Sequence, residues 1–468
     1  MAGTPKKVLA LPASMDQPTT QSHFRRILTR RDLVLYGLVI LTPTAPYPIF
    51  GIVQQLSNGH AVLAYLVAMT AMYFTASSYG KMAAVFPSAG STYTYAQKGL
   101  NAHAGFAAGW AMILDYFLIP LLSVLYASLT AERLLPTVPS WVWAILFTVS
   151  ITWVNLRGIR MTARVSEWLM ALMSICAALF IALAVHHVTA TQGWLALFDF
   201  AAVYQPAAFR SGPLLLGAGV ATLSYIGFDA ISTLAEDSVD PRRDIGWATV
   251  AVCILQGFLC VVTVYCAALV WPDFKTFPNT DTAILDIATV AGGRWMFGFV
   301  TVILLVAGLA SALTGQAGAS RLLLGMGREG LVSSRVFARI DARSSTPIGG
   351  ILVMGAVTLA GSLLLRFQLA VELLNFGALT GFILVNLAVI VHYYVRLRLR
   401  GGWQTIENLV FPILGTLVCG FLWFNLTGKA ILAGVVWLAA GAAYLAILTR
   451  GFQRAPKQLA GLEGNDAN

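Results

Sequence analysis

The sequence predicts an all-α integral membrane protein with twelve transmembrane helices. Of its 468 residues, 58% are apolar and 11% are charged, and the mean hydropathy is +0.76. A soluble globular protein carries about 25% charged residues, so most of this surface cannot face water. The apolar residues also come in runs of about 20, which is the length that an α-helix needs to cross a bilayer. These runs lack the alternation of barrel strands, which excludes an outer-membrane barrel.

A window of about 19 residues places twelve apolar spans along the chain. They lie at about 33–55, 61–85, 104–130, 141–156, 163–185, 212–235, 245–271, 294–320, 347–366, 371–395, 406–425 and 430–449. Residues 1–29 form a polar tail before the first span, and residues 451–468 form a second tail. We expect both tails to be cytoplasmic.

The basic residues support this number of spans and orient it. With both termini inside, 24 of the 30 Lys and Arg residues fall on the cytoplasmic side and 6 fall outside. Cytoplasmic loops carry such an excess, and a missed span would invert it downstream. We therefore expect a multi-pass protein of the cytoplasmic (inner) membrane. The net charge of +10 is distributed beside the apolar runs, so no nucleic-acid partner is expected.

Two spans contain residues that interrupt a helix. The first holds Pro43, Pro46 and Pro48, and each interior proline removes a backbone hydrogen bond. The sixth holds several glycines, including Gly227, and an acid, Asp229. Simple proline kinks and packing glycines are one explanation. Breaks five spans apart favour a five-plus-five inverted repeat with a binding site at its interface, which is typical of secondary transporters.

This interpretation makes residues 30–450 a single twelve-helix transporter domain. The first repeat covers about 33–185, the second about 212–395, and two extra helices occupy about 406–449.

Acidic side chains inside membrane spans are energetically costly and mark substrate or proton sites. Asp229 lies in the predicted break of the sixth span, and Asp115 lies deep in the third span. A carboxylate at this depth pairs with a substrate ammonium or carries a coupling proton. Glu236 follows the break, where it is either a gate or coupling residue or an interfacial acid near Arg242 and Arg243.

Aromatic residues cluster at the same depths. The rings of this group either hold an alkylammonium by cation–π contact or simply pack: Tyr47, Tyr116, Tyr225 and Phe228. Tyr93, after the second span, is a candidate gate residue or an interfacial anchor.

Motifs for catalysis and for metal or cofactor binding are missing from the sequence. The five cysteines lack zinc-type spacing, the histidines lack ligand partners, and no Walker motif occurs. We therefore expect a transporter and not an enzyme, with no cofactor and no metal site. A non-transporting membrane sensor is a remote alternative, since neither tail is long enough to fold as a signalling domain.

Several segments resemble the amino acid–polyamine–organocation permeases, and within them the bacterial putrescine importers. They are RRDLVLYGL in the first span, SYGKMAAVFPSAGSTYTYAQK after the second, AGWAMILDYFLIP in the third, YIGFDAISTLAEDSVDPRRDI in and after the sixth, ASRLLLGMGREGL after the eighth and LLNFGALTGFILVNL in the tenth. The resemblance covers about residues 29–450.

The resemblance implies alternating access about a midplane site and coupling to protons more than to sodium. It also implies that Tyr116 recognises the amine, that Asp229 binds the amine or a proton, and that Glu236 is the acid after the break. Two positions depart from the pattern. Pro48 stands where putrescine importers carry an acid, and Met173 stands where some proton-coupled relatives carry a lysine.

The combined prediction is an importer of a small amine, with putrescine as the leading candidate, coupled to a proton and embedded in lipid. The residues expected to contact substrate are Asp229, Tyr116, Tyr225, Phe228, Gly227, Tyr47, Pro48 and Asp115, and those at the gate or coupling site are Glu236 and Tyr93. A neutral amino-acid permease is the alternative, and it requires free backbone amides in the broken segments.

Overall fold

The computed structural model describes residues 28–87, 91–158, 163–235, 238–328, 333–337, 339–341 and 346–449. Within these ranges the chain is helical, without strands and with one isolated bridge between Leu28 and Ser238. Nine of the described helices are long and apolar enough to cross a membrane. Two shorter apolar helices, Ser140–Leu156 and Ile348–Leu364, accompany them. The chain is therefore an all-helical, multi-pass membrane protein, as predicted.

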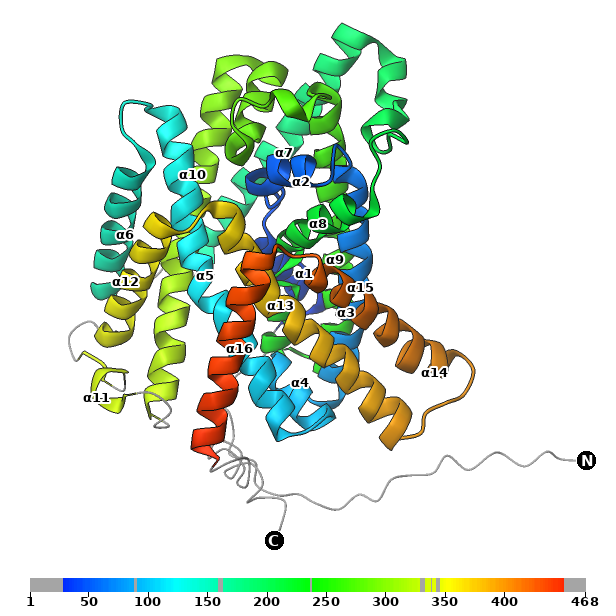
Figure 1. Ribbon diagram of the computed structural model, residues 1–468, viewed down its shortest axis with the longest axis vertical. Coiled ribbons are helices and arrows are strands. Elements are labelled where there is room, and N and C mark those ends of the chain that lie inside the picture. The colour runs from blue at the N-terminus through cyan, green and yellow to red at the C-terminus, as the bar shows by residue number, and fades with distance from the viewer. Residues whose placement is uncertain are drawn as a thin grey trace, which may run out of the picture.

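Ten of the helices pack into a single bundle, with most axes close to the long dimension of the molecule (Figure 1). They are α3 (Ala61–Val85), α5 (Ala102–Leu134), α6 (Ser140–Leu156), α7 (Ala163–Gln192), α9 (Pro241–Val270), α10 (Ala283–Arg328), α12 (Ile348–Leu364), α13 (Phe367–Val389), α15 (Phe411–Phe424) and α16 (Gly428–Leu448). Shorter elements are α4 (Ser91–Gly99), α11 (Ser334–Phe337), α14 (Trp403–Thr405) and two π-helical segments, Ile390–Arg396 and Ile406–Val410.

Two segments are interrupted where the prolines and glycines predicted a break. The first consists of α1 (Arg30–Leu41), the 3-10 turn Tyr47–Ile49 and α2 (Phe50–Leu56). The second consists of α8 (Ser211–Ala221) and two 3-10 segments, Thr222–Tyr225 and Phe228–Leu234. Neither segment continues as one kinked α-helix, so simple kinks do not describe them.

The helix starts have local causes in the sequence. Thr29 and Asp32 form a capping box at the beginning of α1, in which each side chain satisfies a backbone N–H of the other residue. Asn101 caps α5, with its Oδ1 accepting from the Ala104 N–H at 2.9 Å. In α10 the helix is interrupted at Gly293, whose φ of 75° is left-handed, and the eighth predicted span begins just after it.

The packing brings the two broken segments onto shared neighbours. Both α1 and the segment Phe228–Leu234 lie against α9, and α4 contacts that segment as well as α5. Helix α9 also lies very close to α3, because Gly80 and Gly246 face each other. A Cβ built on Gly80 would be 2.7 Å from the Gly246 Cα. Through these contacts, both broken segments are connected to α5.

Candidate functional site

The first break is held open by a side chain from α9. The prolines leave carbonyl groups at the end of α1 without helical donors. Gln256 is fully buried, and its Nε2 donates to the Thr42 carbonyl at 3.0 Å and to the Leu41 carbonyl at 3.4 Å. Thr42 itself has a φ of 56°, which is rare for a threonine. The unwound backbone is therefore bonded by protein and has a defined conformation.

The second break is organised in the same way from α13. Asn375 is fully buried, and its Nδ2 donates to the Gly219 carbonyl at 2.7 Å. The chain then turns at Gly227, whose φ is +119°, a conformation that other residues rarely adopt. A Cβ at Gly227 would also lie 2.8 Å from Cγ2 of Ile40 in α1, so the two broken segments are in direct contact here.

Two carboxyl groups lie within electrostatic range of each other near this turn. Asp229 lies two residues after Gly227, and the backbone N–H groups of Gly227, Asp229 and Ala230 lie near its carboxyl group. Asp115, from the middle of α5, is 5% exposed and lies within electrostatic range of Asp229. Its Oδ1 has no hydrogen-bond partner among the residues that the structure describes. Two acids predicted from the sequence therefore lie close enough to interact electrostatically, and we call them the acidic pair.

No basic side chain of the described ranges forms an ion pair with these two acids. The ion pairs found in those ranges lie elsewhere: Arg30 with Asp244, Lys81 with Glu407, and Arg133 with Asp286. A buried carboxylate without a cationic partner is strongly destabilised. The acidic pair consequently has the electrostatic properties of a site for a cation that arrives from outside the protein.

Tyr116 lies beside both acids and is accessible. It follows Asp115 in α5, interacts electrostatically with Asp115 and Asp229, and remains 43% exposed. An aromatic face next to an acidic pair is suited to an alkylammonium group, because the ring quadrupole attracts a cation. The structure thus brings together Tyr116, Asp115, Asp229 and Gly227 from the predicted set.

A closely packed group of aromatic residues surrounds Asp229. Tyr79 of α3 makes edge contacts with Tyr95 of α4, Phe228 and Phe382 of α13, with ring centroids 5.5 to 5.9 Å apart. All four rings are fully buried. Tyr79 and Tyr95 also lie within electrostatic range of Asp229. Phe228 is therefore part of this packing, and its ring is not accessible to a ligand in this conformation.

Two predicted tyrosines are directed away from the acids. Tyr225 is fully buried and donates to the backbone carbonyl of Tyr65 at 3.0 Å. Tyr47 is 1% exposed and packs on Phe180 of α7 with ring centroids 5.4 Å apart. Its neighbour Pro48, in the same 3-10 turn, is half-buried. These positions leave both rings engaged with other parts of the bundle.

Of the two predicted gate residues, the structure describes Tyr93 but not Glu236. Tyr93 of α4 is half-buried and packs against α5, where a Cβ on Gly109 would lie 3.1 Å from its Cδ2. Glu236 lies outside the described residues.

Sequence reasoning missed Gln256 and Asn375, which support the breaks. A search for every uncharged polar side chain inside an apolar span would have included both.

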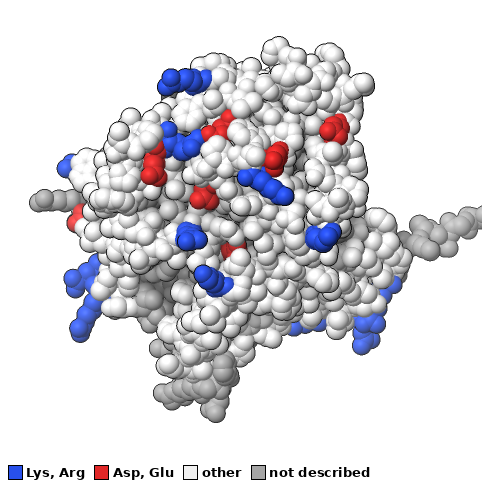
Figure 2. Space-filling model, turned by 45° about the horizontal axis from the view of Figure 1, so that its top comes forward, with Lys and Arg blue, Asp and Glu red and all other residues white. Residues whose placement is uncertain are grey.

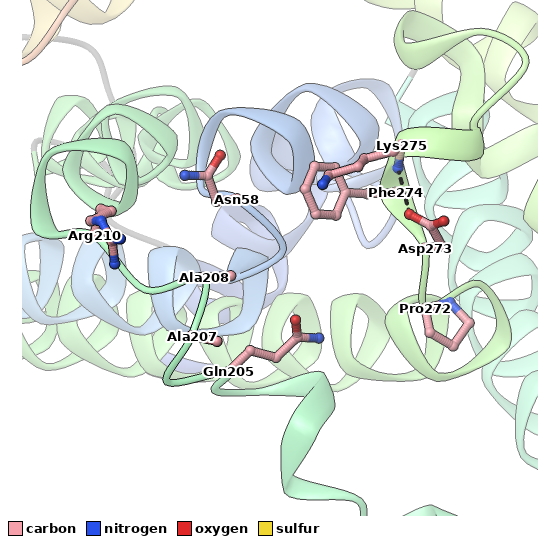
Figure 3. Close-up of a pocket in the computed structure, with 9 residues that line it drawn as sticks. All are labelled: Asn58, Gln205, Ala207, Ala208, Arg210, Pro272, Asp273, Phe274 and Lys275. Atoms are coloured by element: carbon pink, nitrogen blue, oxygen red, sulfur yellow. Dashed lines mark hydrogen bonds between the residues drawn. The ribbon is translucent and has the colours of Figure 1, made fainter.

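A separate hollow of 570 Å³ lies between loops at one end of the bundle (Figure 3). Its lining residues are Asn58, Gln205, Ala207, Ala208, Arg210, Pro272, Asp273, Phe274 and Lys275. In Figure 3 the Asp273 carboxyl group accepts from the Lys275 backbone N–H, at 3.1 Å. None of the predicted site residues lines it. Figure 2, in which the top of the molecule is tilted forward, shows charges of both signs among uncharged residues on the upper part of this face, and Lys and Arg at its lower edges.

Two broken membrane segments in direct contact are typical of membrane transport proteins, and sequence comparison agrees. The chain belongs to the amino acid permease family, whose pattern matches residues 49–453.

Individual relatives show the range of this family. The chain is 34% identical over 449 residues to the low-affinity putrescine importer PlaP of Escherichia coli (strain K12), covering 93% of this chain and 96% of the relative. It is 26% identical over 442 residues to the branched-chain amino acid permease BcaP of Bacillus subtilis (strain 168), covering 90% and 92%. It is 28% identical over 390 residues to the vacuolar cationic amino acid transporter 4 of Arabidopsis thaliana, covering 79% and 63%.

Proposed function

We propose that this protein is a secondary active transporter that imports a small amine, with putrescine as its substrate. The observation that carries the proposal is the pair Asp115 and Asp229, which lies beside an accessible tyrosine and has no basic partner among the described residues. A substrate with two ammonium groups and no carboxylate matches this pair in sign and in number of charges. The similarity to a putrescine importer supports the same substrate.

In this proposal, Asp115 supplies a second acid in place of the one missing at Pro48. The first broken segment lacks the acid expected of a putrescine importer, since Pro48 occupies that position. The site nevertheless holds two carboxyl groups, because α5 supplies Asp115 opposite Asp229. Each charge-assisted hydrogen bond to an ammonium contributes about 1.5–3 kcal/mol. Cation–π contact with Tyr116 adds about 0.5–2 kcal/mol.

The proposed mechanism is alternating access about this site. Its architecture is a twelve-helix domain over residues 30–450 with a five-plus-five inverted repeat and two extra helices. The breaks in the first and sixth segments support it, because such pairs form the substrate site in transporters built from inverted repeats. We place the protein in the cytoplasmic membrane with both termini inside. A proton is the coupling ion, and Glu236 and Tyr93 belong to the gate or coupling route.

A neutral amino-acid permease is the second candidate, favoured by the similarity to the branched-chain amino acid permease. That substrate carries one carboxylate, which needs backbone N–H groups or a cation for recognition. The acidic pair repels a carboxylate placed next to it, so this function requires the unwound backbone of Thr42–Pro46 to bind that group at a distance from the acids.

Uptake of labelled putrescine into proteoliposomes, with and without an imposed proton gradient, tests the proposal. Competition with unlabelled alanine, leucine and spermidine identifies the substrate class. We expect gradient-stimulated uptake that is lost in Asp229→Asn and reduced at least about tenfold in Asp115→Asn, since each variant removes one ionic partner. Asp199→Asn is the matched control, because Asp199 is exposed in the loop after α7. Uptake of only an amino acid would replace the amine by the second candidate.

A further inference from the structure

Helix α10 has two exposed faces of opposite chemistry. One carries Val302 and Val306, which are 51% and 42% exposed. The other carries Ser311 and Thr314, which are also exposed. Ser311 is nine positions after Val302, which places the two about 180° apart at 3.6 residues per turn, and Thr314 is about 80° from Val306. An apolar exposed face suits lipid, whereas hydroxyl groups exposed at membrane depth favour a water-filled space.

The polar face leads along α5 to the acidic pair. Ser123 of α5 donates to Ser311 with the two Oγ atoms 3.1 Å apart. Nearer the other end of α10, a Cβ on Gly315 would lie 3.0 Å from Cγ2 of Ile119. The helices are antiparallel, since residue numbers fall on α5 as they rise on α10. One further turn along both helices places Tyr116 at the level of Gly318.

The surface of α10 is open at Gly318, where this helix lies along α5. A Cβ on Gly318 would have nothing within 4 Å, whereas one on Gly315 would contact α5. Tyr116, on the adjacent part of α5, is 43% exposed and interacts with both acids. The exposed hydroxyls, the open glycine and the accessible tyrosine therefore form one continuous strip.

We propose that Ser311, Thr314 and Gly318 form a water-exposed wall of the substrate path that ends at Tyr116 and the acidic pair. This inference rests on the proposed transport function but not on the identity of the substrate. The competing arrangement is a lipid-facing strip, in which Thr314 is satisfied by its own helix through the Ala310 carbonyl at 3.0 Å. The two arrangements differ in whether water reaches the strip.

Cysteine accessibility distinguishes them. Single variants Ser311→Cys, Thr314→Cys and Gly318→Cys are treated in permeabilised proteoliposomes with a charged methanethiosulfonate reagent, which reaches both sides of the membrane. The matched controls are Val302→Cys and Val306→Cys on the apolar face of the same helix. The five native cysteines are at most 6% exposed, so they contribute a low background. Elution as a single peak in gel filtration shows that each variant is folded.

We expect cysteines on the polar strip to react at least about tenfold faster than the controls, because only the thiolate reacts and hydrocarbon suppresses it. Excess putrescine should slow that reaction. Equally slow reaction on both faces would overturn the proposal. So would fast reaction that putrescine, leucine and alanine all leave unchanged. Protection by an amino acid alone would support the path and overturn the amine as substrate.

Discussion

Gln256 offers a direct test of how the first break is supported. Its side chain is fully buried, and its Nε2 is a donor to the Thr42 carbonyl at 3.0 Å, with a weaker contact to the Leu41 carbonyl at 3.4 Å. Leucine has a similar volume but no donor. The variant Gln256→Leu therefore removes the side-chain donor from both carbonyls at the position where α1 unwinds. The Thr42 carbonyl keeps the Ala45 backbone N–H at 3.1 Å, whereas the buried Leu41 carbonyl has no other partner among the described residues.

The expected loss of stability follows from the hydrogen bond to the Thr42 carbonyl and from the Leu41 carbonyl, which loses its donor. An orphaned buried acceptor costs about 1–3 kcal/mol. Hydrogen bonds between membrane helices average nearer 0.6 kcal/mol, with a maximum of about 1.7. We therefore expect a destabilisation of about 1–2 kcal/mol, seen as a melting temperature lower by a few degrees in detergent. The unwound segment also loses its conformation, so the KM for putrescine should rise by about five- to tenfold, as 1 kcal/mol or slightly more implies.

Gln316 provides the matched control for this effect. It is also buried, and its Nε2 donates to Thr152 Oγ1 at 2.9 Å, on the side of α10 that faces α6. Its Oε1 also accepts from Asn155 Nδ2 at 2.8 Å, so Gln316→Leu should lower the melting temperature by at least as much, and it should leave the KM unchanged. If Gln256→Leu matches the wild type in both stability and KM, the break does not depend on this hydrogen bond. If both variants raise the KM equally, the effect is a general loss of packing.

Three further outcomes are expected. Gly227→Ala should reduce folded yield and uptake, because alanine at a φ of +119° is strained by about 1–3 kcal/mol and its Cβ meets Ile40, whereas Gly212→Ala, in open space, should resemble the wild type in gel filtration and uptake. Tyr116→Ala should weaken apparent putrescine affinity by about 1–2 kcal/mol and Tyr116→Phe by much less, and equal losses in competition assays would show that the hydroxyl and not the ring matters. Glu372, which accepts from the Thr427 N–H at 3.0 Å and from its hydroxyl, connects α13 to the start of α16. Glu372→Gln should increase hydrogen exchange in Gly428–Leu448 without altering the KM, and unchanged exchange would contradict this role.

Much of the fold was predictable because its signals are local. Apolar runs of about 20 residues identify helices wherever they occur, and the prolines at 43, 46 and 48 interrupt a helix whatever surrounds it. Gly227 is similar, since a left-handed backbone conformation strongly favours glycine. The class of protein and the position of both breaks therefore followed from short stretches of sequence. The family predicted from the motifs is confirmed by the match over residues 49–453.

The composition of the site was less predictable. Tyr47, Tyr225 and Tyr116 occur at similar predicted depths, yet only Tyr116 is near the acidic pair. A break changes the rotation of every residue that follows it, so helical periodicity cannot be extended through the unwound segment to decide where Tyr47 or Tyr225 points. Asp115 and Tyr116 lie on an unbroken helix, but their partner Asp229 lies on a distant segment.

Residue type and local pattern thus established that this chain spans a membrane, where its helices break and which side chains are unusual at that depth. Tertiary packing determined which of those side chains meet. Asp115 approaches Asp229 because α4 contacts both α5 and the segment Phe228–Leu234, and Gln256 reaches Thr42 because α1 lies on α9. Such contacts depend on helix rotation and on close approaches like that of Gly80 and Gly246. Those are properties of pairs of helices, and no single stretch of sequence contains them.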